Sequence, residues 1–212
     1  MLKRRRPKAP MAGITELPPS APGMRIGLFG GSFNPIHDGH VLVMEETLRR
    51  LGLDALWVLV TPGNPLKNHS ELRPLAERVQ AARDKIANPR IKVTGFEAAH
   101  GFTYTYETLR HLADTLADRN FVWIMGADSL ADFHRWSRWR EIAETMPIAV
   151  YVRPGASSRA LASRAAAVLA KNRIDEEAAN QLADRSPPVW VFLRGRQSSL
   201  SSSAIRAGKQ AS

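Results

Sequence analysis

Cysteine is absent from the 212 residues of this chain, which excludes disulfide bonds, thiol nucleophiles and zinc sites built on cysteine. The absence is compatible with a reducing compartment. No apolar run reaches the roughly 18 residues that a membrane-spanning helix needs, so we expect a soluble, cytoplasmic protein. The glycines after the first apolar segment lack the spacing G-x-G-x-x-G, and no lysine follows them. This argues against an ordinary nicotinamide-dependent dehydrogenase and against a Walker-type nucleotidase.

Acidic residues are outnumbered, with 20 Asp and Glu against 30 Lys and Arg, for a formal net charge of +10. Residues 1–23 hold five of the basic residues and one acidic residue, Glu16, so the remainder of the chain is also basic. A basic protein suits a partner rich in phosphate, either a nucleotide or a nucleic acid. A solvated basic surface would produce the same composition, so charge alone leaves the class of function open.

Residues 1–23 show no apolar periodicity and combine a basic run with Pro, Gly and Ser, which predicts a disordered extension. No apolar segment follows the basic run, so it is not a secretory signal. Met24 stands directly before the first apolar segment, and we expect the extension to be dispensable. Residues 24–212 are then expected to form a single domain, with no internal repeat or long linker.

From Met24 onward, short apolar runs alternate with amphipathic segments. The pattern predicts strands at 24–30, 55–60, 91–95, 121–126, 147–152 and 188–193. It predicts helices at 37–52, 74–87, 105–117, 160–172, 175–184 and 201–208, with short helical pieces at 128–133 and 138–146. Nearly continuous apolar strands separated by helices indicate an α/β, Rossmann-like doubly wound sheet, mostly parallel, with helices on both faces. Ligands of such sheets bind at the carboxyl ends of the strands.

The segment GGSFNPIHDGH, residues 30–40, follows the first predicted strand. Gly30 and Gly31 allow a tight turn and close approach of the backbone to a phosphate. His37 and His40 then stand at the first turn of a helix, where free N–H groups already favour an anion and two imidazoles would add donors. Metal binding is the alternative use of two histidines, but no third ligand stands nearby in the sequence.

This segment resembles the G-G-x-F-[DN]-P-[hydrophobic]-H-x-G-H signature of the bacterial nicotinate-nucleotide adenylyltransferases, within the His-x-Gly-His nucleotidyltransferase superfamily. LSSSAIRAG, residues 200–208, resembles the family's I-S-S-T-x-[IV]-R element, with Leu200 for Ile and Ser203 for Thr. Further similar pieces are TPGNPLKN (61–68), FTYTYETL (102–109), GADSLADFHRW (126–136) and RPG (153–155). The resemblance covers roughly residues 24 to 208.

The resemblance implies an enzyme of NAD biosynthesis that transfers the adenylyl group of ATP to nicotinate mononucleotide, with Mg²⁺ arriving on the ATP phosphates. The residues that it implies for catalysis are His37, His40 and Arg206. Those that it implies for ATP binding, besides these three, are Gly30, Gly31, Ser32, Phe33, Gly126, Asp128, Ser202 and Ser203. Those for the nicotinate mononucleotide are Lys67, Thr105, Trp136 and Arg153. From the sequence alone, Lys67 also fits a solvated loop, and Trp136 with Trp139 fits a core stripe.

Two other readings stay open at this point. One is a related adenylyltransferase that acts on nicotinamide mononucleotide or phosphopantetheine, although the latter group usually shows Thr-x-Gly-His, and His37 argues against it. The other is a basic nucleic-acid-binding module, which would have no need of His37, Gly39 and Arg206. We expect ATP and nicotinate mononucleotide as partners, with no nucleic acid and no membrane, and the sequence leaves a homo-oligomer open.

Overall fold

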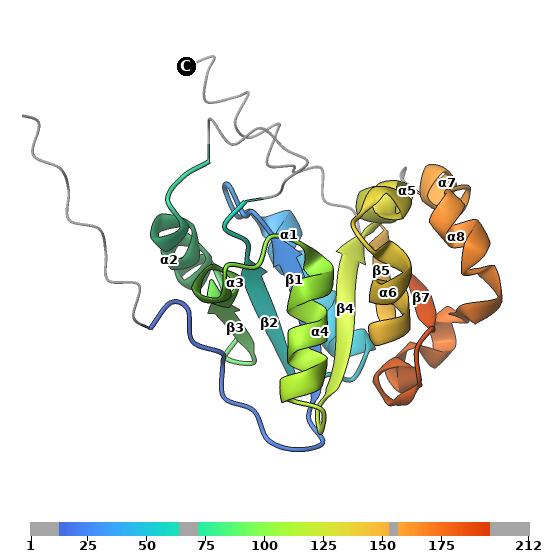
Figure 1. Cartoon of the computed structure of the whole chain (residues 1–212), viewed down its shortest axis with the longest axis horizontal. Coiled ribbons are helices and arrows are strands. Elements are labelled where there is room, and N and C mark those ends of the chain that lie inside the picture. The colour runs from blue at the N-terminus through green and yellow to red at the C-terminus, as the bar shows by residue number, and fades with distance from the viewer. Residues whose placement is uncertain (1–12, 64–71, 153–156, 196–212) are drawn as a thin grey trace, which may run out of the picture.

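The computed structural model describes residues 13–63, 72–152 and 157–195. Seven parallel strands form one sheet in the order β3-β2-β1-β4-β5-β7-β6 (Figure 1). Their bounds are β1 Arg25–Gly31, β2 Ala55–Val60, β3 Ile91–Thr94, β4 Asn120–Gly126, β5 Ile148–Val152, β6 Arg173–Ile174 and β7 Trp190–Arg194. The predicted Rossmann-like fold is confirmed, and the two-residue β6 is a strand that periodicity did not indicate.

Helices cover both faces of this sheet, and Figure 1 shows α4 and α6 in front of it and α1 behind it. The α-helices are α1 Asp38–Arg50, α2 Leu75–Lys85, α3 Phe96–His100, α4 Thr105–Thr115, α5 Ala127–Asp132, α6 Trp139–Thr145, α7 Ser157–Leu161 and α8 Arg164–Val168. Three 3₁₀ segments follow: η1 Phe133–Arg135, η2 Ala170–Asn172 and η3 Glu176–Asp184. Within the part of the chain that the structure describes, no helix is long and apolar enough to cross a bilayer.

The prediction of one continuous helix over 160–172 is wrong. The helix is interrupted at Ser163, whose hydroxyl accepts a hydrogen bond from the N–H of Ala166 (3.2 Å) and caps a separate helix, α8. A side chain that competes for backbone N–H groups ends one helix and begins another. The helix predicted over 175–184 is present as the 3₁₀ segment η3, and the helix predicted over 201–208 lies outside the described residues.

Two cores lie on the two faces of the sheet, and β2 shows how one strand serves both. Ala55, Trp57 and Leu59 belong to the core beneath α4, α5 and α6, whereas Leu56, Val58 and Val60 belong to the core beneath α1 and α2. Every residue of β2 is buried. A strand buried on both faces reads as a continuous apolar run rather than an alternating one, which is why ALWVLV is recognisable in the sequence.

Residues 13–23 lie against the domain, so the prediction of a disordered extension is wrong for this segment; residues 1–12 lie outside the described residues. The carbonyl of Ile14 accepts from the N–H of Gly95 (2.6 Å), and that of Glu16 accepts from the Thr94 hydroxyl (2.7 Å). Farther along, the N–H of Gly23 donates to the carbonyl of Asp118 (2.6 Å). We call residues 13–23 the N-terminal strap.

We therefore expect removal of the strap to destabilise the protein, contrary to the dispensability that the sequence indicates. Thr94 is only 1% exposed, and deletion of residues 1–23 uncovers its hydroxyl group. The deletion also removes Ile14 and Leu17 from the edges of the two cores. Losses of this kind cost about 1–3 kcal/mol, which lowers the melting temperature by roughly 3–10 °C for a chain of this size. Deletion of residues 1–12 alone is the matched control and should leave the melting temperature unchanged. Equal melting of the two truncated proteins would contradict the role of the strap.

Candidate active site

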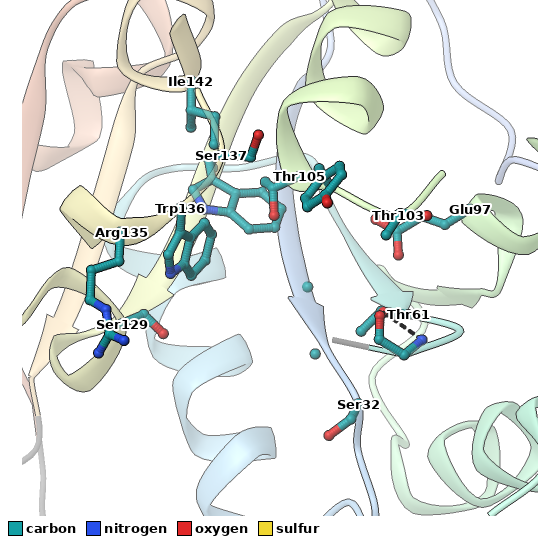
Figure 2. Close-up of a pocket in the computed structure, with 15 residues that line it drawn as sticks. Ser32, Thr61, Glu97, Thr103, Thr105, Ser129, Arg135, Trp136, Ser137 and Ile142 are labelled. Carbon is teal, nitrogen blue, oxygen red and sulfur yellow. Dashed lines mark hydrogen bonds between the residues drawn. The ribbon is translucent and has the colours of Figure 1, made fainter. Parts of the chain in front are cut away.

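A cavity of about 350 Å³ opens at the carboxyl ends of β1, β2 and β4, where the order of the sheet reverses (Figure 2). Its lining comes from the end of β1, the turn after β2, helix α3, the start of α4, strand β4 and the segment from α5 to α6. These residues are Gly30, Gly31, Ser32, Thr61, Gly63, Glu97, Thr103, Tyr104, Thr105, Trp123, Ser129, Arg135, Trp136, Ser137 and Ile142. The topology predicts a ligand site at this reversal.

Gly30 brings the backbone of β1 against the Trp123 indole on neighbouring β4. A Cβ atom at Gly30 would lie 2.5 Å from the Trp123 ring, which is closer than real side chains approach. Trp123 is itself 3% exposed, so the ring has little room to move. The sequence motif therefore needs a glycine at this position for packing as well as for access to the cavity.

The two histidines stand at the beginning of α1, immediately beyond the turn after β1. His37 is the N-cap residue, and its N–H donates to Nδ1 of His40 (3.3 Å). Because Nδ1 accepts, the proton of a neutral His40 ring is assigned to Nε2, which makes that atom a donor. The two rings stack with centroids 3.8 Å apart, and the buried Phe33 ring contacts His40 edge-on at 5.1 Å. Phe33 thus supports the pair from the core.

The start of α4 forms the opposite wall of the cavity and is held by Glu107. Its carboxylate accepts from the N–H of Thr103 (2.8 Å) and of Tyr104 (2.9 Å). The hydrogen bond from Tyr104 lowers the pKa of Glu107 below its ordinary value, and the bond from Thr103 makes a smaller contribution in the same direction. The N–H groups of Thr105 and Tyr106 come next, and the first N–H groups of a helix have no partner within it. This turn is preorganised to receive an anion.

Trp136 lines the cavity between η1 and α6, while Trp139 does not. Trp139 is buried against Phe133, with ring centroids 5.7 Å apart, and belongs to the core. Trp136 is partly exposed and contacts the same Phe133 edge-on at 5.4 Å. From the sequence, both tryptophans could belong to the core, and in the structure this is true of Trp139. Trp136 instead offers an aromatic surface to a planar ligand.

Glu97 is the unusual polar group of this cavity. It lies on α3, and its Oε1 accepts from the Thr108 hydroxyl of α4 (2.8 Å). Burial raises the pKa of the Glu97 carboxyl to about 7, and the Thr108 hydrogen bond offsets part of that rise. Most of the site is uncharged, so a carboxyl that is half protonated near neutrality is a candidate for a functional role.

The structure brings several of the sequence-predicted site residues to one cavity. Gly30, Gly31, Ser32, Thr105 and Trp136 line it. Gly126 ends β4 and caps α5, and Asp128 is exposed in the first turn of α5. Among described residues His37, His40 and Phe33 border the glycine turn without lining the cavity itself. Lys67, Arg153, Ser202, Ser203 and Arg206 lie outside the described residues.

Sequence reasoning missed Glu97, Arg135 and the serines at 129 and 137. Arg135 and Ser129 lie within residues 126–136, a segment that resembles the family, so their nearness in sequence to Trp136 and Asp128 is a signal for both. Glu97 had only the weak signal of a lone acid after an apolar strand.

Comparisons with known proteins identify the family to which the chain belongs. The cytidylyltransferase-like family model matches residues 28–208. A Mesorhizobium japonicum protein named "probable nicotinate-nucleotide adenylyltransferase" is 57% identical over 190 residues, covering 90% of this chain and 97% of its own length. A Rhizobium meliloti protein of the same name is 55% identical, covering 88% and 99%. In fold, the chain is similar to the Plasmodium falciparum nicotinic acid mononucleotide adenylyltransferase complexed with NaAD, with a TM-score of 0.65, 19% identity, and coverage of 87% and 83%.

The raised pKa of Glu97 makes a prediction about stability. In the unfolded chain this carboxyl titrates near 4.5, and in the folded chain near 7. The folded state then binds more protons between these values, so the free energy of unfolding falls as pH rises from about 4.5 through about 7 and is constant above. Each pH unit between the two pKa values is worth about 1.4 kcal/mol, for an effect of about 3 kcal/mol.

Glu97→Gln keeps the acceptor for Thr108 but removes this titration. We expect the variant to melt roughly 5–10 °C above the unchanged protein at about pH 8, and at the same temperature near pH 4.5. Thermal unfolding at several pH values measures the difference. Glu144→Gln, at an exposed position on α6, is the matched control. A pH-independent difference between Glu97→Gln and the unchanged protein would contradict the assignment.

Proposed function

Since the chain belongs to the cytidylyltransferase-like family and, within it, to the nicotinate-nucleotide adenylyltransferases, we infer that it transfers the adenylyl group of ATP to nicotinate mononucleotide. The products are nicotinate adenine dinucleotide and pyrophosphate. The observation that carries this inference beyond family membership is one cavity that joins an aromatic surface, Trp136, and the start of α4, at Thr105, to the glycine turn of β1.

The reaction requires no protein nucleophile. A phosphate oxygen of the mononucleotide attacks the α-phosphorus of ATP, a new P–O bond forms, and the bond from the α-phosphorus to the bridging oxygen breaks as pyrophosphate leaves with its electrons. The attacking oxygen is already anionic. The barrier therefore lies in bringing two polyanions into line and stabilising the charge that moves to pyrophosphate.

We assign the charge stabilisation to the turn after β1 and the start of α1. In this proposal the backbone at Gly30, Gly31, Ser32 and Phe33 receives the ATP phosphates, and His40 donates from Nε2. His37 joins it, because the stacked rings and the N–H to Nδ1 bond orient the pair as one unit. The first N–H groups of α1, a helix of 13 residues, add to the same field.

We place the acceptor mononucleotide in the cavity itself. Its pyridine ring stacks on Trp136, and its carboxylate faces the N–H groups of the first turn of α4, which Glu107 keeps in position. Gly126, at the end of β4, and Asp128, in the first turn of α5, are proposed on the adenosine side. Lys67 and Arg153 for the mononucleotide, and Ser202, Ser203 and Arg206 for the ATP phosphates, rest on the sequence resemblance.

A divalent cation, which we propose to be Mg²⁺, enters as part of the ATP substrate. Mg²⁺ is usually held by substrate phosphates and one or two carboxylates rather than by an all-protein cage. Across residues 13–63, 72–152 and 157–195, no three His, Asp or Glu side chains gather to hold an ion. A cytoplasmic location is proposed because ATP is the co-substrate.

The test of this function is pyrophosphate release from ATP with nicotinate mononucleotide, nicotinamide mononucleotide or phosphopantetheine as acceptor. The first should be the preferred acceptor. Turnover only with phosphopantetheine, or with no acceptor at all, would overturn the proposal.

We expect His40→Ala to reduce kcat by about 10²–10³, the usual cost of losing one preorganised donor to developing charge. Steady-state kinetics with both substrates measure the loss, and circular dichroism verifies the fold. His100→Ala is the control, because His100 is an exposed histidine on α3 that packs on Phe102. A folded His40→Ala protein with near-normal kcat would remove His40 from the mechanism.

We also expect the acid to be preferred over the amide. N–H donors at the start of α4 match a carboxylate but are mispaired with the N–H₂ group of nicotinamide, and each mispaired buried group costs roughly 1–3 kcal/mol. At about pH 6, kcat/KM for nicotinate mononucleotide should exceed that for nicotinamide mononucleotide by about a hundredfold or more. Trp136→Ala should lower both values and leave their ratio nearly unchanged. Equal efficiencies would refute the acid assignment and leave adenylyl transfer standing.

A further inference from the structure

Glu97 places a carboxyl group in the same cavity that we propose receives the carboxylate of nicotinate mononucleotide. Two acidic groups in one cavity require an explanation. Glu97 is held from two sides. Phe96, the residue before it, is 1% exposed in the core, and Gly95 is bonded to the N-terminal strap. Thr108, which donates to its Oε1, has no exposed surface. The position of the Glu97 carboxyl is therefore fixed by its neighbours in the folded chain.

Glu97 is also close to the place proposed for the substrate carboxylate. Thr108 and Thr105 are three residues apart on α4, so they share one face of the helix and lie about one turn from each other. The carboxyl bonded to Thr108 consequently stands beside the helix start that faces the ligand. Glu97, Thr103 and Thr105 line the same cavity (Figure 2).

Among the residues that the structure describes, the charged groups around Glu97 do not compensate a negative charge there. On α3 and α4, His100 and His111 lie against each other and against Phe96 and Phe102. Glu107 is engaged by the N–H groups of Thr103 and Tyr104. From the strap, the Glu16 backbone contacts Thr94, and from the turn after β2 the uncharged Thr61 and Gly63 line the cavity. Arg135 lines the cavity next to Trp136 and pairs with Asp132 (3.9 Å). Among described residues, burial raises the pKa of Glu97 and the Thr108 hydrogen bond offsets part of the rise, with no contribution from a charged group.

We propose that Glu97 is a specificity-determining residue, whose protonated carboxyl donates a hydrogen bond to the carboxylate of nicotinate mononucleotide and whose ionised form rejects it. Two carboxyl groups at one site share a proton, because two adjacent negative charges repel each other. An amide has the opposite preference, since its N–H₂ group donates to an ionised carboxylate. The acid-to-amide preference of the enzyme then depends on pH. This inference rests on the proposed function and deepens it.

The experiment compares kcat/KM for nicotinate mononucleotide and nicotinamide mononucleotide from about pH 5.5 to about pH 9. The two acceptors carry the same phosphate and use the same ATP and the same histidines, so dividing one kcat/KM by the other cancels those titrations. The pH dependence of kcat/KM reports groups of the free enzyme. We expect the acid-to-amide ratio to fall by about tenfold or more between about pH 6 and about pH 8.5, with a midpoint near 7.

Two variants test the assignment to this residue. In Glu97→Gln the ratio should be independent of pH. In Thr108→Val the midpoint should move to higher pH, because the lost hydrogen bond favoured the ionised carboxyl. Glu144→Gln is the control and should show the unchanged profile. Melting temperatures establish that each variant is folded, and a merely structural role of Glu97 would move kcat/KM for both acceptors together without altering the slope.

The outcomes separate this inference from the proposed function. A flat ratio in the unchanged protein, or a pH slope that survives in Glu97→Gln, would overturn the role of Glu97 while adenylyl transfer to nicotinate mononucleotide stands. Failure of the unchanged protein to use nicotinate mononucleotide at any pH would overturn both.

Discussion

Parallel pairing of β1 with β2 on one side and β4 on the other is the interaction on which the site depends. It places the ends of three strands at one edge, where Gly30 pairs with Leu59 of β2 and the preceding Phe29 with Ile124 of β4. The approach is close enough that the Trp123 ring excludes any side chain at Gly30. The turn that follows delivers the histidine pair to the start of α1, so binding geometry and core packing are set by the same contact.

The site divides the chemistry between two helix starts. The start of α1 carries the stacked imidazoles of His37 and His40, whereas the start of α4 is held in place by the Glu107 carboxylate. In the proposed reaction the start of α1 stabilises the charge that develops on pyrophosphate, and the start of α4 recognises the carboxylate of nicotinate, whose charge does not change. Trp136, supported edge-on by the buried Phe133, lies with the second. An arrangement of this kind allows acceptor recognition to change without altering the phosphate site.

The sequence predicts much of the fold, because strands buried on both faces read as uninterrupted apolar runs. It does not predict β6, whose two residues are too few for any period, or the break at Ser163, where a side-chain cap overrides helical spacing. The two segments 30–40 and 126–136, which resemble the family, contain Gly30 and Trp136, and both residues line the cavity. The resemblance does not locate Glu97, because the meaning of that residue depends on burial and on Thr108, which lies eleven positions away. The strap escaped for another reason: the domain holds it largely through the carbonyls of Ile14 and Glu16, and every residue type has a carbonyl.

The carbonyl of Ile14 in the strap accepts a hydrogen bond from the N–H of Gly95, two residues before Glu97. Helix α3 has only five residues, so it is too short to be rigid by itself. The hydrogen bond to Gly95 limits the positions that the Glu97 carboxyl samples before a ligand binds. This restriction reduces the conformational entropy that is lost on binding. A chain begun at Met24 would keep the recognition motifs of its family and lose this tether. The substrate selection that we propose at one end of the cavity is thereby connected to a segment that carries no motif and does not line the cavity.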